Sequence, residues 1–532
     1  MNSIITESDV EEACLAMLEK QGYTILSGPD IAEDGPHPER TYHEVVLVAR
    51  LRNALTKINP SLPKEALEEA IKKVIRTDSQ HLVLNNQHFH KFVTDGIPVE
   101  YNTKDGVKHN IAWLFDFNNV ENNEFLAINQ FTILEDRNNR RPDILLFVNG
   151  LPLVIFELKN IADEATTVWS AFNQIETYKE QIPSLFRFNE LVVISDGLEA
   201  RAGTITSDKE RFIPWKTVSG KHILKNAPQV QVLIEGMLNK QVLMDLIRHF
   251  IVFEAEKSKK EGTVTISKKV AAYHQYHAVN KAVKSTIKAI TSDQRAGVVW
   301  HTQGSGKSLI MVFYAGKLVL QPELENPTLI LLTDRNDLDD QLFGTFSRCH
   351  ELLRQKPEQA DSREKIKELL KVSSGGIIFT TIQKFMPEER GKQYPLLSNR
   401  KNIVVIVDEA HRSQYDFIDG FAKHLRDALP HASFIGFTGT PIEKADKSTP
   451  AVFGNYVDVY DITQAVEDGT TVKIFYESRL AKLELKPEER PHIDKYFEDI
   501  TEQEEQEQKE KLKSKWARLE KVVGSHNRLR RI

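Results

Sequence analysis

A glycine-containing loop between two apolar runs constrains the fold of this chain more than any other stretch. Residues 297–300 form a short apolar run, residues 301–308 read His-Thr-Gln-Gly-Ser-Gly-Lys-Ser, and residues 309–313 are apolar again. The first run is typical of a buried strand, and the last is typical of the start of a buried helix. Strand, glycine loop and helix in this order predict a phosphate-binding loop in an α/β fold.

Each part of the loop suits the binding of a nucleotide phosphate. Gly304 and Gly306 let the backbone turn its N–H groups toward a phosphate, and the helix N-terminus adds partial positive charge. Lys307 can reach the β- and γ-phosphates, and the hydroxyl of Ser308 can bind Mg²⁺. The strict pattern has glycine at the position that His301 occupies, so this chain departs from it there.

A pair of acids follows another apolar run further along the chain. Residues 402–407 read as a strand buried on both faces, and Asp408 and Glu409 come directly after it. At the carboxyl edge of a parallel sheet, Asp408 would hold the nucleotide's Mg²⁺ through water and Glu409 would polarise the attacking water. A third apolar run, residues 433–437, ends in Thr-Gly-Thr-Pro at 438–441, whose hydroxyls suit sensing of the γ-phosphate.

These motifs, in this order, resemble the first motor domain of superfamily two helicases and translocases, which is a RecA-like parallel α/β fold. In that family a glutamine at the position of Gln275 reads adenine, and segments matching 332–335 and 380–383 contact the nucleic-acid backbone. The resemblance implies ATP and Mg²⁺ as cofactors, with Ser308 and Asp408 as the residues that hold the Mg²⁺. The residues expected to bind the cofactor are Gln275, Thr302, Gly304, Ser305, Gly306, Lys307, Ser308 and Asp408.

Composition narrows the class of protein. A chain of 532 residues predicts two to four domains, and 40% hydrophobic with 27% charged residues is ordinary for a globular protein. The net charge of −6 confines any DNA contact to a local basic stripe. The two cysteines, Cys14 and Cys349, stand far apart, which suits a reducing cytoplasm. Neither a signal peptide nor a membrane-spanning run is evident, so we expect a cytoplasmic protein without a membrane partner.

A second candidate site lies on a predicted hairpin. Two apolar runs flank Asn149 and Gly150, which is a strong turn signal. Asp143 precedes the turn, and Glu157 and Lys159 follow it two residues apart, hence on one face of the second strand. Two carboxylates can hold Mg²⁺, and a lysine can orient or deprotonate the attacking water. The alternative interpretation is an ion pair on the surface of a hairpin.

The register of this hairpin decides between a site and an ion pair. A two-residue turn pairs Val148 with Leu151 and leaves Glu157 facing away from Asp143. A three-residue loop, with a bulge at its glycine, pairs Val148 with Pro152 and places Asp143 opposite Glu157. The chemical interpretation requires the two acids on one face, so we predict the bulged hairpin.

The helix that follows supports a nuclease. The hairpin resembles the core of Pro-Asp…Glu-x-Lys nucleases, and Gln174 and Tyr178 stand at i and i+4 on one face of the next predicted helix. Such a pair can position the scissile phosphate and the water that attacks it. A third acid is expected at the site, and the sequence leaves Glu7 and Glu11 as equal candidates.

Together the motifs closely resemble the restriction and motor (R) subunit of type I restriction enzymes, in which histidine is usual at the position of His301. The resemblance implies an ATP-driven translocase of double-stranded DNA fused to a Mg²⁺-dependent endonuclease that cuts unmethylated foreign DNA. Methyltransferase (M) and specificity (S) subunits would be its partners. The implied catalytic residues are Asp143, Glu157, Lys159, Gln174, Tyr178 and Glu409, and the implied metal ligands are Asp143, Glu157, Ser308 and Asp408. The segments that carry the resemblance are 138–143, 157–160, 169–178, 300–308 and 408–413.

Three segments are expected in the fold. Residues 1–255 would form a PD-(D/E)xK nuclease-like domain with a mixed sheet, and residues 256–472 the RecA-like motor domain. Residues 473–532 read as a charged helix leading to a second motor lobe that the chain lacks, since they are too few for a lobe of about 150 residues. We therefore expect a truncated form in which ATP turnover is nearly absent.

Elements expected outside the motifs are less sharply defined. Helices are expected over 7–21, 41–56 and 63–76, strands over 110–117, 123–135 and 191–194, and the end of a helix over 251–260.

Two alternative functions remain open. The first is an ATP-dependent remodeller whose N-terminal domain only docks partners, in which Asp143, Glu157 and Lys159 do not converge. The second is a truncated subunit that binds nucleotide, DNA and the methyltransferase without cutting.

Overall fold

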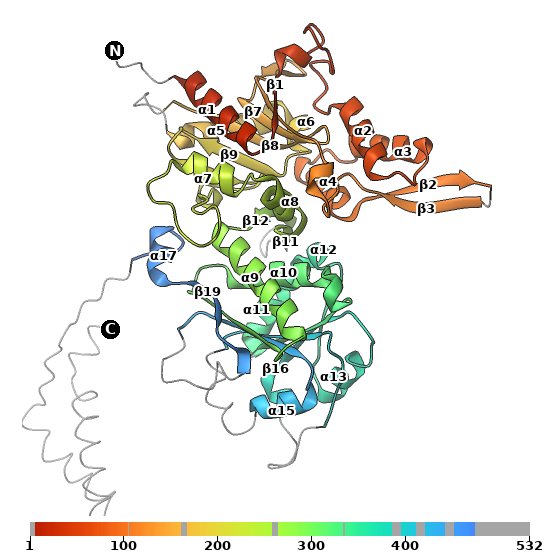
Figure 1. Cartoon of the computed structure of the whole chain (residues 1–532), viewed down its shortest axis with the longest axis vertical. Helices are drawn as coiled ribbons and strands as arrows, with labels where there is room; N and C mark the ends of the chain where they lie inside the picture. The colour runs from red at the N-terminus through yellow and green to blue at the C-terminus, as the bar shows by residue number, and fades with distance from the viewer. Residues whose placement is uncertain are drawn as a thin grey trace, which may run out of the picture. The chain divides into compact units, whose positions relative to one another are not determined.

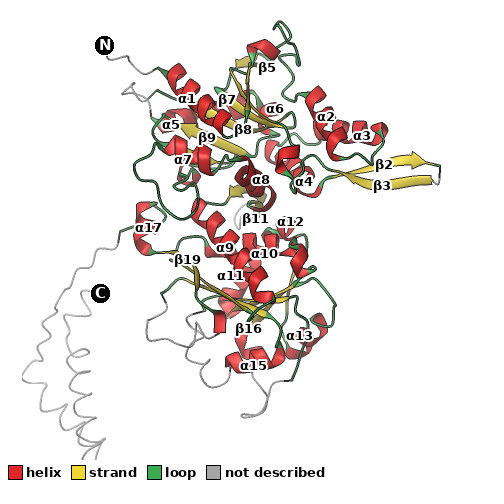
Figure 2. Cartoon of the chain, in the orientation of Figure 1, coloured by secondary structure: helices red, strands yellow, loops and turns green. Residues whose placement is uncertain are grey.

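The computed structural model describes residues 6–104, 106–160, 167–257, 264–333, 336–385, 395–410, 421–441 and 452–473. Residues up to Thr471 form one compact unit that contains two large sheets and their covering helices (Figures 1 and 2). The expected charged helix, apart from Lys473, lies outside the described residues. No helix in the described part of the chain is long and apolar enough to cross a membrane.

The first sheet is mixed and has six strands in the order β1-β4-β7-β8-β9-β10. The β1–β4 and β8–β9 pairs are parallel, and the other three pairs are antiparallel. Every residue of β7 and β8 is buried, because helix α5 (Val168–Gln181) packs on β8 and β9 while α1 (Glu7–Lys20) packs on β1, β4 and β8. The strands are β1 (Thr24–Ser27), β4 (Phe125–Asn129), β7 (Ile144–Val148), β8 (Leu151–Leu158), β9 (Leu191–Ser195) and β10 (Ala200–Gly203).

The second sheet has seven strands, all parallel, in the order β15-β16-β14-β17-β18-β13-β19. The central strands are continuous apolar runs, as expected when helices cover both faces of a parallel sheet. The strands are β13 (Arg295–His301), β14 (Thr328–Thr333), β15 (Pro357–Gln359), β16 (Ile377–Thr381), β17 (Ile403–Val407), β18 (Ser433–Thr438) and β19 (Tyr456–Tyr460). The predicted fold class, a mixed sheet followed by a parallel α/β sheet, is confirmed.

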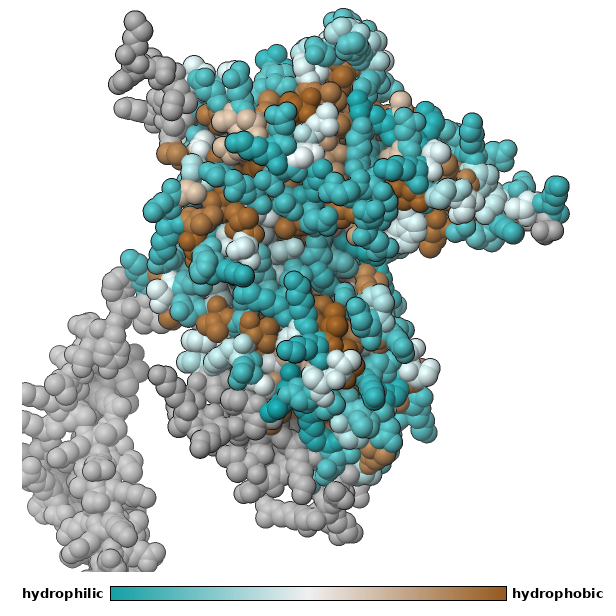
Figure 3. All heavy atoms as spheres, viewed as in Figure 1, coloured by the Kyte–Doolittle hydropathy of each residue, from teal (hydrophilic) through white to brown (hydrophobic). Residues whose placement is uncertain are grey.

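Helices surround both sheets, and the visible face of the described part is largely hydrophilic, with hydrophobic residues in separate groups (Figure 3). The helices up to residue 249 are α1 (Glu7–Lys20), α2 (Val48–Ile58), α3 (Lys64–Ile75), α4 (Leu82–Asp95), α5 (Val168–Gln181), α6 (Pro183–Phe186), α7 (Gln229–Gly236) and α8 (Lys240–His249). The helices of the second part are α9 (Tyr273–Ile290), α10 (Lys307–Val319), α11 (Asn336–Arg348), α12 (His350–Leu353), α13 (Arg363–Leu369), α15 (Phe421–Ala428) and α17 (Ile462–Glu467).

Three two-stranded sheets complete the described part. They are β2 (Ile97–Thr103) with β3 (Gly106–Ala112), β5 (Ile133–Glu135) with β6 (Asn138–Arg140), and β11 (Ile251–Lys257) with β12 (Val264–Val270).

Several expected elements differ in the structure. The helix expected from residue 41 begins at Val48, and the strand expected over 110–117 ends at Ala112. The helix end expected over 251–260 is wrong, because residues 251–257 form β11, which pairs with β12 along its whole length. The pairing of β11 with β12 depends on tertiary structure, and the spacing of apolar residues within 251–260 does not predict it.

Candidate functional site

The β7–β8 hairpin has its bulge at a different place from the predicted one. Val148 pairs with Leu151 and Phe147 with Pro152, so the predicted pairing of Val148 with Pro152 is wrong. Asn149 and Gly150 form a two-residue turn in which both have positive φ, 52° and 80°, as a type I′ hairpin turn requires. The turn is anchored, because the buried amide of Asn149 donates hydrogen bonds to the carbonyl of Leu114 and to Asn123.

The bulge lies instead at Leu153, where the register shifts. Beyond the bulge, Leu146 pairs with Val154 and Ile144 pairs with Phe156. Asp143 precedes Ile144 and Glu157 follows Phe156, so the two acids lie opposite each other. The predicted consequence, two acids on one face, therefore holds although the predicted cause does not.

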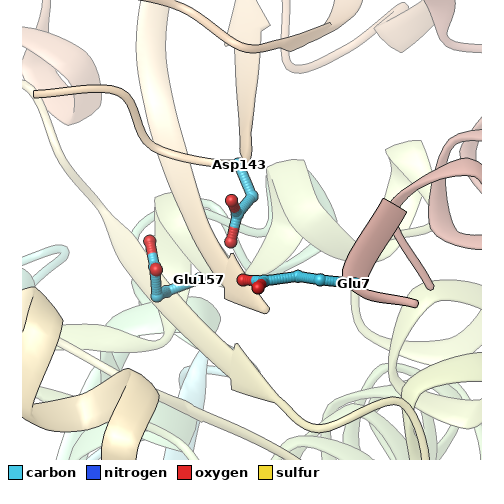
Figure 4. Close-up of side chains that lie close together, drawn as sticks. All are labelled: Glu7, Asp143 and Glu157. Carbon is cyan, nitrogen blue, oxygen red and sulfur yellow. The ribbon is translucent and has the colours of Figure 1, made fainter. Parts of the chain in front are cut away.

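Three carboxylates converge at this face (Figure 4). Oxygen atoms of Glu7, Asp143 and Glu157 lie within 4.8 Å of one another. Both oxygens of Glu11 accept hydrogen bonds of 2.6 Å from the amides of Asn129 and Gln130, which hold Glu11 in another place. Of the two candidates for the third acid, Glu7 is therefore the one that joins the pair.

Lys159 bridges two of these acids. Its Nζ lies 2.8 Å from Glu157 Oε1 and 3.1 Å from Glu7 Oε1, and it also donates to the carbonyl of Leu158. The backbone N–H of Leu158 donates to Asp143 Oδ2 at 2.7 Å. An ammonium group thus sits among the oxygen atoms that a divalent cation would use.

The electrostatics of the site favour a bound cation. Burial, and then the charge of Asp143, raise the pKa of Glu157 to about 8, and burial raises the pKa of Asp143 to about 6. The second oxygen of Glu157, Oε2, is buried without a hydrogen-bond partner among the described residues. A buried carboxylate oxygen without a partner is costly, and a hard cation such as Mg²⁺ would satisfy it. The donor set therefore fits a divalent metal ion.

Helix α5 brings two further predicted residues to this place. Gln174 Nε2 donates a 2.6 Å hydrogen bond to the hydroxyl of Tyr178. Burial, and then the charge of Glu157, raise the pKa of Tyr178, so its phenol lies close to that acid. The structure thus gathers five predicted residues, Asp143, Glu157, Lys159, Gln174 and Tyr178, around one point.

The predicted phosphate-binding loop joins β13 to α10. Gly304 and Gly306 have φ of 85° and 78°, in the left-handed region that favours glycine, and Lys307 begins the helix. A Cβ at Gly306 would lie 2.5 Å from Gln275 Nε2. The start of the loop is also fixed to the end of β19, since the N–H of Thr302 donates a hydrogen bond to the carbonyl of Tyr460.

Gln275 contacts the loop directly. Its Nε2 donates to the carbonyl of Ser305 at 3.1 Å, and its Oε1 accepts from the N–H of Ala272 at 3.0 Å. The hydroxyl of Ser305 is buried without a hydrogen-bond partner among the described residues. Both amide atoms of Gln275 therefore help to shape the loop and the start of α9.

The acidic pair follows β17, which lies between β14 and β18, while β18 lies beside β13. Glu409 has a φ of 49°, and its N–H donates to Asp408 Oδ1 at 2.9 Å. Lys307 reaches toward the end of β18, where a Cβ at Gly439 would come within 2.9 Å of its Nζ. The carboxyl ends of parallel strands meet at one edge, so the loop, the acids and residues 438–441 share that edge.

His301 is a structural residue that the sequence did not explain. It is buried, and its Nε2 lies 2.7 Å from Asp458 Oδ2, while Lys281 pairs with Asp458 Oδ1 at 2.6 Å. The histidine thus ties β13 to the neighbouring strand β19. Asp334, Arg335 and residues 411–413, which contributed to the resemblances, lie outside the described residues.

Comparison with known proteins agrees with this arrangement. Residues 4–211 match the family model described as type I restriction enzyme R protein N terminus, and residues 274–510 match the SWI2/SNF2 ATPase model. These two stretches contain the mixed sheet and the parallel sheet respectively.

Two curated relatives are similar along almost the whole chain. The type I restriction enzyme HindI endonuclease subunit of Haemophilus influenzae is 45% identical over 99% of this chain and 50% of that protein. The putative type I restriction enzyme MjaIXP endonuclease subunit of Methanocaldococcus jannaschii is 36% identical over 98% of this chain and 51% of that protein. The chain thus spans about half the length of the curated relatives it matches.

Among solved structures, a fragment of a putative HsdR subunit of a type I restriction enzyme from Vibrio vulnificus YJ016 is 18% identical, with a TM-score of 0.26. It covers 71% of this chain and 55% of that one. Two family models match the chain, and two relatives align with 98–99% of its length. The chain therefore belongs to the family of type I restriction enzyme endonuclease (R) subunits.

Proposed function

We propose that this chain carries the nuclease and the first motor part of an R subunit. It moves double-stranded DNA at the expense of ATP and cuts unmethylated foreign DNA with Mg²⁺, in the cytoplasm, together with methyltransferase (M) and specificity (S) partner subunits. The observation that carries the proposal is the convergence of Glu7, Asp143, Glu157 and Lys159 around a buried carboxylate oxygen without a partner among the described residues.

In the proposed nuclease, Glu7, Asp143 and Glu157 hold Mg²⁺. The ion would supply positive charge that stabilises the charge developing on the scissile phosphate. Lys159, which contacts two of these carboxylates, would orient the attacking water or accept its proton. Gln174 and Tyr178, on the adjoining face of α5, position the phosphate and this water.

In the proposed motor, the loop and the acidic pair act on ATP. Backbone and side-chain groups of Thr302, Gly304, Ser305, Gly306 and Lys307 bind its phosphates. Ser308 and Asp408 hold its Mg²⁺, Glu409 orients the attacking water, and Gln275 reads adenine or holds the loop that binds the phosphates. In this proposal residues 1–255 form the nuclease part, residues 256–472 the motor part, and residues 473–532 a charged connecting segment.

A cleavage assay tests the proposal. The chain is incubated with its methyltransferase and specificity partners, ATP, Mg²⁺ and unmethylated duplex DNA, beside an Asp143→Ala variant. Metal-dependent cleavage that disappears in Asp143→Ala is the expected result. A folded protein that binds Mg²⁺, nucleotide and partner but leaves the DNA intact would contradict it and favour a binding subunit without nuclease activity.

The convergence also weighs against a remodeller without a nuclease, since that alternative requires Asp143, Glu157 and Lys159 to lie apart. The distances of 2.8 Å and 3.1 Å from Lys159 to Glu157 and Glu7, together with the carboxylate cluster, favour the nuclease instead.

A further inference from the structure

An open pocket of about 440 Å³ is lined by residues of α8 and α9 together with Phe117 and Val120. Polar and basic side chains dominate its wall, and Phe117 contributes an aromatic ring. The pocket is distinct from both sites described above, because none of the nuclease or nucleotide residues lines it.

The carboxylate in this pocket is already neutralised. Asp245 on α8 accepts two hydrogen bonds from Lys317, one of 2.7 Å, and another from Asn280 at 3.3 Å. Lys317 is held further by Asn280 Oδ1 at 2.7 Å. Among the described residues that line the pocket, Asp245 carries the acidic group, and Lys317 already forms an ion pair with it.

Two basic residues of the pocket remain without such a partner. Arg248 forms no ion pair with a described residue, and its Nε is buried without a hydrogen-bond partner in the described ranges. Its guanidinium lies 4.8 Å above the ring of Phe117, which fixes the orientation of the group. Lys284 on α9 is exposed at the pocket wall and likewise forms no ion pair with a described residue.

The surrounding charges strengthen this imbalance. Burial, and then the nearby Arg354, lower the pKa of Arg248, although Asp245 acts in the opposite direction. Burial also lowers the pKa of Lys317 against the effect of its partner Asp245, and Lys284 and Arg248 contribute to that decrease. Cations that repel one another in a partly buried place raise the affinity of that place for an anion.

We propose that the pocket between α8 and α9 binds a phosphate group of the DNA backbone, with Arg248 and Lys284 as its ligands. This inference rests on the proposed function, because a protein that moves DNA needs interactions with the backbone that do not depend on sequence. A planar guanidinium held on an aromatic ring presents N–H groups suited to two phosphate oxygens, and an exposed lysine adds a flexible charge. The pocket is open, so a polymer can lie across it.

Equilibrium binding of a short fluorescent duplex to the full chain tests the inference. The titration is run in EDTA, so that no cleavage occurs, and is repeated over a series of salt concentrations. The combined Arg248→Ala and Lys284→Ala variant should bind the duplex at least about tenfold more weakly, since a charge-assisted hydrogen bond contributes about 1.5–3 kcal/mol. The dependence of log K on log salt should become shallower by about 0.9 for each phosphate that the variant no longer neutralises. Arg248→Lys, which keeps the charge but not the planar fork, should have an affinity between those of the wild type and the combined variant.

A matched control is Arg52→Ala, which removes an exposed arginine paired with Glu68 on the neighbouring helix. It should leave the affinity for the duplex and the salt dependence unchanged, and thermal melting should show that all variants remain folded. Unchanged duplex binding in the combined variant would overturn the inference.

Two further measurements distinguish DNA from free phosphate as the ligand, and distinguish failure of the nuclease proposal from failure of this inference. Calorimetry with tripolyphosphate tests free phosphate: if the wild type binds it through these residues while duplex binding is unaffected, the assignment to DNA is wrong. If the wild type fails to cut DNA but the combined variant still binds the duplex more weakly, the nuclease proposal fails and the inference stands.

Discussion

Lys159 Nζ lies 2.8 Å from the fully buried Glu157, so the cation proposed to act on water is also the counterion of a proposed metal ligand. The same nitrogen lies 3.1 Å from Glu7. In this arrangement Lys159 neutralises carboxylates that would hold a divalent ion, so the ion and the ammonium group would compete for the same oxygen atoms.

Magnesium binding should strengthen as the pH rises from below 6 to above 8. The pKa of Glu157 is raised to about 8 and that of Asp143 to about 6, chiefly by burial, and the ion binds the ionised forms. Each proton displaced makes the affinity rise about tenfold per pH unit below the corresponding pKa. Titration calorimetry in two buffers of different ionisation enthalpy measures both the affinity and the protons released. An affinity that does not change over this range would contradict the prediction.

The metal-free protein should become less stable as the pH rises toward 8. The folded-state pKa of Glu157 lies above its ordinary value of 4.5, so folding favours the protonated form. The resulting stabilisation is complete below about 4.5 and disappears as the pH rises through about 8. Glu157→Gln should flatten the melting temperature over this range, whereas Glu68→Gln, at an exposed salt bridge, should not. A wild-type melting curve independent of pH would count against the assignment.

Glu7→Gln and Glu11→Gln should behave differently. Loss of the Glu7 carboxylate removes a proposed metal ligand, and Mg²⁺ affinity should fall about tenfold or more. Glu11 accepts hydrogen bonds from Asn129 and Gln130, so its replacement should lower the stability by about 1–3 kcal/mol and leave metal affinity nearly unchanged. Calorimetry and urea unfolding separate the two effects. Equal losses of metal affinity would mean that Glu11 also reaches the ion.

Gly306→Ala should abolish nucleotide binding. The residue has a φ of 78°, and the added Cβ would lie 2.5 Å from Gln275 Nε2, which holds the loop through Ser305. A suitable control is Gly106→Ala, where φ is also positive but nothing lies within 4 Å of the new Cβ. It should cost only the strain of the backbone, about 1–3 kcal/mol, and leave nucleotide binding intact. A fluorescent ATP analogue reports binding, and full binding by Gly306→Ala would show that the loop tolerates a side chain.

Local sequence was enough to predict strands β7, β8 and β9 of the first sheet, strands β13, β17 and β18 of the second, and the glycine positions of the phosphate-binding loop. Continuous apolar runs such as 403–407 report burial on both faces, and Gly304 and Gly306 stand where a left-handed backbone is needed. These properties depend on the residues themselves and their immediate neighbours, so they can be predicted before the chain is folded.

The sequence by itself therefore determined which carboxylates and which lysine are available, and that they stand on a hairpin. Only the tertiary structure decided that the bulge lies at Leu153, that Glu7 rather than Glu11 joins Asp143 and Glu157, and that residues 251–257 form a strand. The physical reason is the same in each case. Register, the partner of a carboxylate and the pairing of β11 are set by residues distant in the chain, such as Asn123, Asn129 and the strand β12, whose positions no local pattern encodes.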